Sequence, residues 1–241
     1  MAVVDIAPIE AAPRRDLIIG LDCDGVLASD HELWEALYIA YPHFIPPAYS
    51  LLTTYEWPRL TPETTELCLR LSADPDFTRN LRPLPAMGWA IRALHQRGWE
   101  IHIVTARPKA VYEATREWLD LHEVGHLVTA VHCTENKAPL VQELGCAVFV
   151  EDNPRTAETL GALGIRSYLL DACYNRRPTM HCIRVAGWPS LMNDLTAYQW
   201  SLQPESALSP IARRKGRIIE SARNRLSEAL LPGMSGLQPA V

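Results

Sequence analysis

Short apolar runs alternate with amphipathic segments along most of this chain. The apolar runs predict strands at residues 17–21, 99–104, 127–131, 147–150 and 167–170. Helical spacing of apolar residues, capping residues and helix-ending glycines predict helices at 33–38, 62–71, 85–97, 110–121 and 138–144 and in the segment that ends at Gly164. Strands that alternate with helices of this length form right-handed crossovers, so the pattern predicts an α/β fold with a parallel sheet.

The segment between the first two strands has no strand pattern of its own. Residues 30–83 contain two helical stretches, the first capped by Asp30, and we expect them to form a small helical insertion. The rest of the fold then consists of residues 14–29 and 84–196, a discontinuous core. Residues 197–241 form a separate C-terminal tail.

The tail carries arginines and lysines around an apolar helical stripe, which predicts a basic amphipathic helix with a disordered end. Its candidate partners are nucleic acid, an acidic protein or a second copy of the chain in a homodimer. A solvated helix without a partner is the more economical interpretation, so nucleic-acid binding is not favoured.

Composition narrows the class of protein. With 241 residues, 48% of them apolar, the chain can bury a full core. No apolar stretch approaches the roughly 20 residues of a membrane span, and acidic residues near the N-terminus do not suit a secretory signal, so we expect a cytoplasmic protein without membrane contact. The six cysteines lack CxxC spacing, which favours free thiols, and the net charge of −5 argues against a general nucleic-acid platform.

Polar residues follow four of the predicted strands. The carboxyl ends of parallel strands meet at one edge of a sheet, where ligands bind. Two carboxylates one residue apart repel each other unless a cation lies between them, and carboxylate pairs suit Mg²⁺, whereas a hydroxyl and a lysine suit a phosphate. The residues are Asp22, Asp24, Thr105, Lys137, Glu151 and Asp152. Taken alone, Asp22 and Asp24 also fit an ordinary Asx-rich turn.

The chain resembles the haloacid dehalogenase superfamily of aspartate-nucleophile phosphatases over about residues 16–178. The four motifs of that superfamily appear in order along the sequence, as residues 22–25, Thr105, Lys137 and residues 151–152. The resemblance implies a Rossmann-like three-layer core with a small helical cap. It also implies that Asp22 attacks the phosphate, that Asp24 is the acid and base, and that Thr105 and Lys137 bind the phosphate. We also expect Ala106, the residue after Thr105, at the phosphate. Mg²⁺ would be held by Asp22, Asp24 and Asp152, with Glu151 behind them.

Finer likeness points to the branch of 5′(3′)-deoxyribonucleotidases. The stretches 84–87, 148–154 and 169–176 carry it. It implies a small phosphorylated substrate, a nucleoside monophosphate above all. Glu151 replaces the more usual aspartate of the pair, and Arg107 has no fixed role in the motif set; we take it as a phosphate or nucleotide ligand, with a solvated loop charge as the alternative.

The helical insertion is rich in aromatic residues. A nucleobase could stack on one of them, although aromatic side chains at helical spacing more often form a core. They are Trp34, Tyr38, Tyr41, Phe44, Tyr55 and Trp57.

His122 to His126 match the zinc-protease pattern H-E-x-x-H. The pattern needs both histidines on one helix, yet Gly125 is unfavourable inside a helix and β-branched residues follow it, so we expect the helix to end there.

Three functions remain open from the sequence. The favoured one is a magnesium-dependent phosphatase of small phosphomonoesters. A polynucleotide 3′-phosphatase that uses the basic tail is the second, and a non-enzymatic interaction protein on the same fold is the third.

Overall fold

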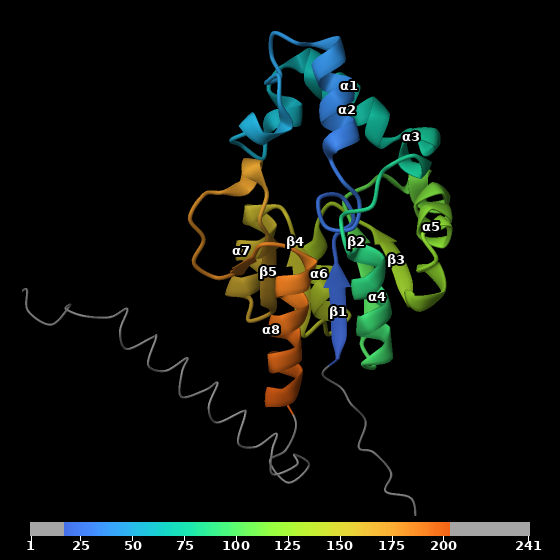
Figure 1. The fold of residues 1–241 in the computed structure, drawn as a ribbon, viewed down its shortest axis with the longest axis vertical. Helices are drawn as coiled ribbons and strands as arrows, with labels where there is room; N and C mark the ends of the chain where they lie inside the picture. The colour runs from blue at the N-terminus through green and yellow to red at the C-terminus, as the bar shows by residue number, and fades with distance from the viewer. Residues whose placement is uncertain (1–16, 203–241) are drawn as a thin grey trace, which may run out of the picture. The chain divides into compact units, whose positions relative to one another are not determined.

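The computed structural model describes residues 17–202 of the chain. Six parallel strands form one sheet in the order β3-β2-β1-β4-β5-β6 (Figure 1). The strands are β1 (Ile18–Leu21), β2 (Glu100–Thr105), β3 (Ala130–Cys133), β4 (Val148–Glu151), β5 (Arg166–Leu170) and β6 (Ile183–Val185). The parallel α/β fold predicted from the sequence is therefore confirmed.

Helices cover both faces of this sheet. In Figure 1, α4 lies in front of the sheet, whereas α6 and α7 lie behind it. The helices that follow residue 83 are α4 (Met87–Gln96), α5 (Tyr112–Leu121), α6 (Lys137–Glu143), α7 (Pro154–Ala162) and α8 (Trp188–Ser201). Val141 of α6 and Leu160 of α7 pack with Phe149 of β4, and all three are fully buried. These contacts fix the rear layer against the middle of the sheet.

The segment from 30 to 83 lies beyond the carboxyl ends of the strands (Figure 1). It contains α1 (His31–Ala40), α2 (Pro62–Ser72) and α3 (Pro75–Arg79), with short 3₁₀ turns at Tyr49–Leu51 and Trp57–Arg59. Its inner residues, among them Leu37, Ile45 and Trp57, form a core together with Tyr174 from the turn after β5.

Two linkers join this segment to the sheet and pair with each other. Ser29 N donates to Arg82 O at 2.8 Å, and Leu84 N donates to Leu27 O at 2.7 Å. A second connection forms through Trp118 of α5, whose indole Nε1 donates to Leu81 O at 2.7 Å. The helical segment is thus held over the strand ends at two places.

The predicted elements and the observed ones differ in a few positions. The predicted start of the strand at 127–131 is wrong. Residues Gly125–Leu127 form a 3₁₀ turn (η4), and the strand begins only at Ala130, which pairs with His102 of β2. The structure adds β6, α3 and the whole of α8, none of which was predicted. The six cysteines are free, as expected.

The chain divides into two compact units, with the boundary between Met192 and Asn193 inside α8. In the second unit the structure describes residues 193–202, most of them the remainder of that helix. The basic tail predicted for 197–241 lies mainly outside the described residues. No helix among residues 17–202 is both long and apolar enough to cross a membrane.

Candidate active site

The strand order reverses between β1 and β4, the usual place for a ligand in an open parallel sheet. Asp22 follows β1 directly, and Glu151 and Asp152 lie at the end of β4. The backbone N–H of Asp22 continues the ladder by donating to Val150 O at 2.9 Å. Carboxylates from both sides of the switch point therefore converge, and their oxygens lie within 4.8 Å of one another.

Lys137 lies between two of these carboxylates. Its Nζ is 2.7 Å from Asp22 Oδ2 and 2.6 Å from Glu151 Oε1. The lysine is the first residue of α6, so the turn after β3 delivers its side chain to the ends of β1 and β4. The other Asp22 oxygen, Oδ1, accepts from Cys23 N at 2.7 Å. Asp22 is consequently fixed at both oxygens.

Glu151 is fully buried and has both carboxylate oxygens occupied by the protein. While Oε1 contacts Lys137, Oε2 accepts from the backbone N–H groups of Asp152 and Asn153, each at 2.9 Å. The side chain therefore orients the loop that carries Asp152.

Asp152 is held differently. Its Oδ2 accepts from the Tyr174 hydroxyl at 2.8 Å, and Asn175 Nδ2 donates to its backbone carbonyl at 2.8 Å. Its Oδ1 is buried and has no hydrogen-bond partner among the described residues. A buried carboxylate oxygen without a partner is costly, which makes it a candidate metal ligand.

Electrostatics in this cluster favour a bound cation. Burial raises the pKa of Asp22 well above its ordinary value, and the Glu151 carboxylate raises it further, whereas Lys137 opposes the rise. Burial, followed by the charges of Asp30 and Glu151, likewise raises the pKa of Asp152. Burial alone would lower the pKa of Lys137, but the two carboxylates raise it above its ordinary value, so the lysine stays charged. Oxygen ligands with surplus negative charge fit Mg²⁺.

Asp24 faces a different cation. The guanidinium of Arg107 contacts both Asp24 oxygens, with Nη2 2.6 Å from Oδ1 and Nε 2.9 Å from Oδ2. Arg107 Nη1 also donates to Thr115 Oγ1 at 3.0 Å. The alternative considered for Arg107, a solvated loop charge, is wrong, because its side chain is only 4% exposed.

A cavity of about 800 Å³ opens between the strand ends and the helical segment. Its floor contains Asp22, Asp24, Thr105, Arg107 and Asp152, together with the exposed Ala106. Thr105 Oγ1 accepts from Arg107 N at 3.2 Å, which shapes the turn after β2. The cavity brings these sequence-predicted residues together, and Lys137 and Glu151 lie beneath it through their contacts with Asp22 and Asp152.

The aromatic residues of the helical segment are mainly its core. Trp57 is buried in that core, and most of the others pack against it. Tyr55 and Trp57 also line the cavity, whereas Phe44 is about half exposed. Tyr55, which is only half-buried, is therefore the better placed of the two to contact a bound substrate, since Trp57 is almost fully buried.

Three site residues had no clear signal in the sequence. Asp30 is at the N-cap of α1 as predicted, but its side chain makes no capping bond and instead lines the cavity. Burial, and next the charge of Asp24, raises the pKa of Asp30 to about 7. Tyr174 and Thr115 reach the site from a 3₁₀ turn after β5 and from α5, so tertiary packing alone places them there.

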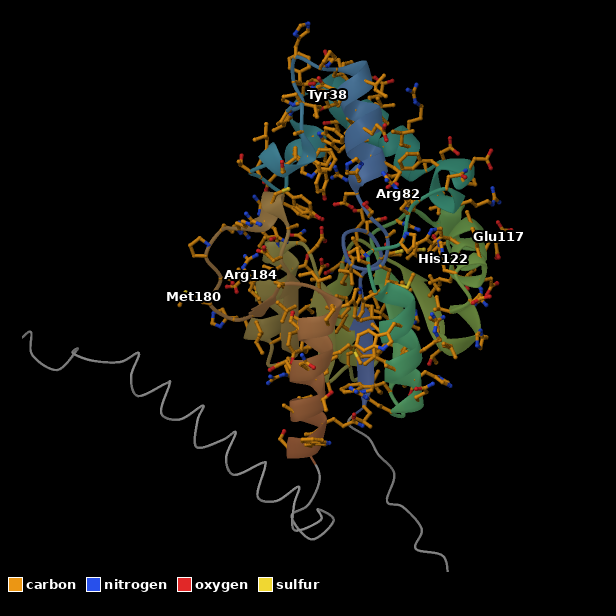
Figure 2. The ribbon with its side chains drawn as sticks, in the orientation of Figure 1. Tyr38, Arg82, Glu117, His122, Met180 and Arg184 are labelled. Carbon is orange, nitrogen blue, oxygen red and sulfur yellow. The ribbon has the colours of Figure 1, made fainter. Side chains whose placement is uncertain are left out.

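The H-E-x-x-H pattern does not form a metal site. The helix α5 ends at Leu121, Glu123 has a positive φ of 57°, and His126 lies in a 3₁₀ turn, so the two histidines are not on one helical turn. His122 packs edge-on against Trp118, with ring centroids 4.7 Å apart. Figure 2 shows His122 on the α5 side of the fold.

A sequence profile of one protein family matches residues 16–199, well over half of the chain. Its description is "5' nucleotidase, deoxy (Pyrimidine), cytosolic type C protein". A nucleotidase of Clostridium acetobutylicum is 33% identical over 89 residues, which cover 36% of this chain and 46% of that protein. The chain matches between 46% and 63% of the length of the curated relatives.

Solved structures share the fold at low sequence identity. A phosphoglycolate phosphatase, described as predicted, from Haemophilus somnus superposes with a TM-score of 0.50 at 16% identity, covering 76% of this chain and all of that one. A haloacid dehalogenase superfamily hydrolase from Ehrlichia chaffeensis gives a TM-score of 0.50 at 10% identity, covering 75% and 96%. These similarities concern the fold.

Proposed function

The chain belongs to the family of cytosolic type C 5′ nucleotidases, and from that premise we propose that it hydrolyses the phosphomonoester of a nucleoside monophosphate. The observation that supports this most directly is the position of Asp22, which Lys137 fixes at the floor of the cavity, within 4.8 Å of a carboxylate oxygen of Asp152. A carboxylate held in this way can act as a nucleophile towards phosphorus.

The reaction divides into two displacements. In the first, a carboxylate oxygen of Asp22 forms a bond to phosphorus, the bond from phosphorus to the ester oxygen breaks, and Asp24 gives a proton to the departing alcohol. In the second, water attacks the phosphorus of the aspartyl-phosphate and gives a proton to Asp24. The bond to Asp22 then breaks and orthophosphate leaves.

Other residues of the cavity bind and orient the phosphate. The Thr105 hydroxyl and the backbone of Ala106 line the floor beside Asp22, where they can donate to phosphoryl oxygens. Lys137 keeps its positive charge next to Asp22 and so favours the ionised nucleophile. Tyr55, which is half-buried and lines the cavity, offers an aromatic face to the base of the substrate.

Mg²⁺ is the metal that we propose for this site. Asp22, the Asp24 backbone carbonyl and Asp152 would hold it, while Glu151 supports the Asp152 loop. The ion would neutralise the carboxylates and polarise the phosphoryl oxygens.

Replacement of the nucleophile tests the proposal. Asp22→Asn is expected to abolish phosphate release from deoxynucleoside monophosphates in the presence of Mg²⁺, and EDTA is expected to stop the wild-type enzyme. Asp120→Asn, which changes an exposed carboxylate on α5, is the matched control and should retain full activity. Full activity of Asp22→Asn would refute the mechanism.

A further inference from the structure

Arg107 is engaged by three groups of the protein. Besides its two contacts with Asp24 and its bond to Thr115, its own backbone N–H donates to Thr105 Oγ1. Each of the three guanidinium nitrogens therefore has a protein acceptor within 3.0 Å. A planar guanidinium with this many fixed contacts has one orientation, which is set by Asp24 on one side and by α5 on the other.

Asp24 depends on this contact for its own orientation. Its side chain is 46% exposed, and among residues 17–202 only Arg107 forms a hydrogen bond or ion pair with its carboxylate. A half-exposed aspartate without such a partner would sample several staggered rotamers. Arg107 thus restricts the carboxylate to one direction at the floor of the cavity.

We infer that Arg107 is a positioning residue, which holds the Asp24 carboxylate in the direction needed for proton transfer, and not a ligand of the substrate phosphate. This inference rests on the proposed function, in which Asp24 is the acid and base. Proton transfer requires the carboxyl group within hydrogen-bond distance of the ester oxygen, so a loss of orientation lowers the rate without removing the group itself.

The charge balance of the pair also argues against phosphate binding. The Arg107 side chain is buried, and its guanidinium forms an ion pair with the Asp24 carboxylate at 2.6 Å. Turning the guanidinium towards a phosphate would break a bidentate pair and leave Asp24 without its partner. Such a rearrangement is costly for a group with buried contacts.

Two substrates with different leaving groups distinguish a positioning role of Arg107 from a role in binding the phosphate. A deoxynucleoside 5′-monophosphate releases an alkoxide that needs a proton, whereas 2,4-dinitrophenyl phosphate releases a phenolate that does not. For Arg107→Gln we expect kcat on the nucleotide to fall by about 10²-fold, the range of a general acid contribution, with KM little changed. The pre-steady-state burst of dinitrophenolate, which reports only the first displacement, should stay near the wild-type rate.

A double-mutant cycle shows whether Arg107 acts through Asp24. If it does, the Asp24→Asn, Arg107→Gln double variant will be no slower on the nucleotide than Asp24→Asn alone. Arg107→Lys, which keeps the charge but cannot contact both oxygens, should recover part of the rate. Arg116→Gln removes an exposed cation from the same helix as Thr115 and is the matched control.

Folding is controlled separately. Thr115→Val keeps both charges and the side-chain shape but removes the anchor of Nη1, so it should show the same preference for the aryl ester to a smaller extent. Thermal melts show which variants are folded. If Arg107→Gln does not fold, the rates of Thr115→Val on the nucleotide and on the aryl ester are compared instead.

Three results would overturn the inference. They are equal losses on both substrates together with weaker inhibition by orthophosphate, multiplicative effects in the double variant, or a wild-type nucleotide rate for Arg107→Gln. Full activity of Asp22→Asn would instead overturn the proposed function and the inference with it, so the two failures are distinguishable.

Discussion

Gly25 lies where the loop after β1 passes closest to Asp152. Its φ is +71°, a conformation that side chains rarely adopt, and a Cβ atom built on it would lie 2.8 Å from Asp152 Cβ and closer still to the carboxylate. Since both loops carry site residues, Gly25→Ala is expected to destabilise the protein and to displace Asp152 at the same time.

The magnitude follows from two separate costs. The left-handed conformation costs a residue with a side chain about 1–2 kcal/mol. The added methyl group in a tightly packed site costs about 1–3 kcal/mol more. Gly25→Ala should therefore lower the free energy of unfolding by about 2–5 kcal/mol.

A matched control isolates the clash from the strain. Gly145 has nearly the same φ of +69°, yet no atom lies within 4 Å of a Cβ built on it. Gly145→Ala should consequently show only the strain cost of about 1–2 kcal/mol and keep full activity.

Urea denaturation of both variants without added metal measures the difference, and phosphate release with Mg²⁺ measures the effect on the site. We expect Gly25→Ala to be the less stable of the two and nearly inactive. Equal stability of the two variants, or an active Gly25→Ala protein, would refute the close approach of the two loops.

Two further predictions concern pH and metal. Burial and the neighbouring Asp30 and Glu151 charges raise the pKa of Asp152, so its charged form costs the folded state stability once the pH rises above the pKa of the unfolded chain. Asp152→Asn should therefore stabilise the metal-free protein at pH 7 by about 1–3 kcal/mol. The same substitution should remove the increase in Tm that we expect Mg²⁺ to give the wild type, and thermal melts measure both effects. Burial lowers the pKa of His132, and so does His102, whose Nδ1 lies 3.1 Å from His132 Nε2. The folded state therefore loses stability as the pH falls below about 6.5, the pKa of a histidine in the unfolded chain. The decline in Tm between about pH 7 and 5 should be shallower for His132→Gln than for the wild type, and an unchanged decline would contradict this.

The middle of the sheet was predictable because its four central strands, β2, β1, β4 and β5, are short, apolar and buried along nearly their whole length. Such runs stand out from the amphipathic helices between them. Once the strands are known, the residue that follows each of them can be placed at the carboxyl edge of the sheet, where ligands bind. This is why Asp22, Thr105 and Asp152 could be expected to converge. The structure brings them to one cavity.

Two of the three missed elements, β6 and α3, lack that contrast. The strand β6 has only three residues, two of them half-buried, and α3 has five residues directly behind α2. The start of β3 was misplaced because Leu127 and Val128 are apolar, although the chain completes a 3₁₀ turn there before it reaches its pairing position opposite β2.

Partners of individual side chains were beyond the sequence for a different reason. Arg107 and Asp24 are separated by 83 positions, and Thr115 completes the contact from the next helix. A lone arginine after a strand can reach a phosphate, solvent or a carboxylate with equal ease on spacing alone. Only the packed fold decides which acceptor it meets.

The glutamate at position 151 shows how a departure from the usual aspartate pair can preserve a site. The longer side chain turns back so that one oxygen accepts from two backbone N–H groups of its own loop while the other reaches Lys137. Asp24 is balanced separately by Arg107. The remaining group, Asp22, Glu151 and Asp152 against one lysine, carries two surplus negative charges when fully ionised. A divalent cation would cancel that surplus, and the unpartnered Oδ1 of Asp152 is the atom best placed to bind it.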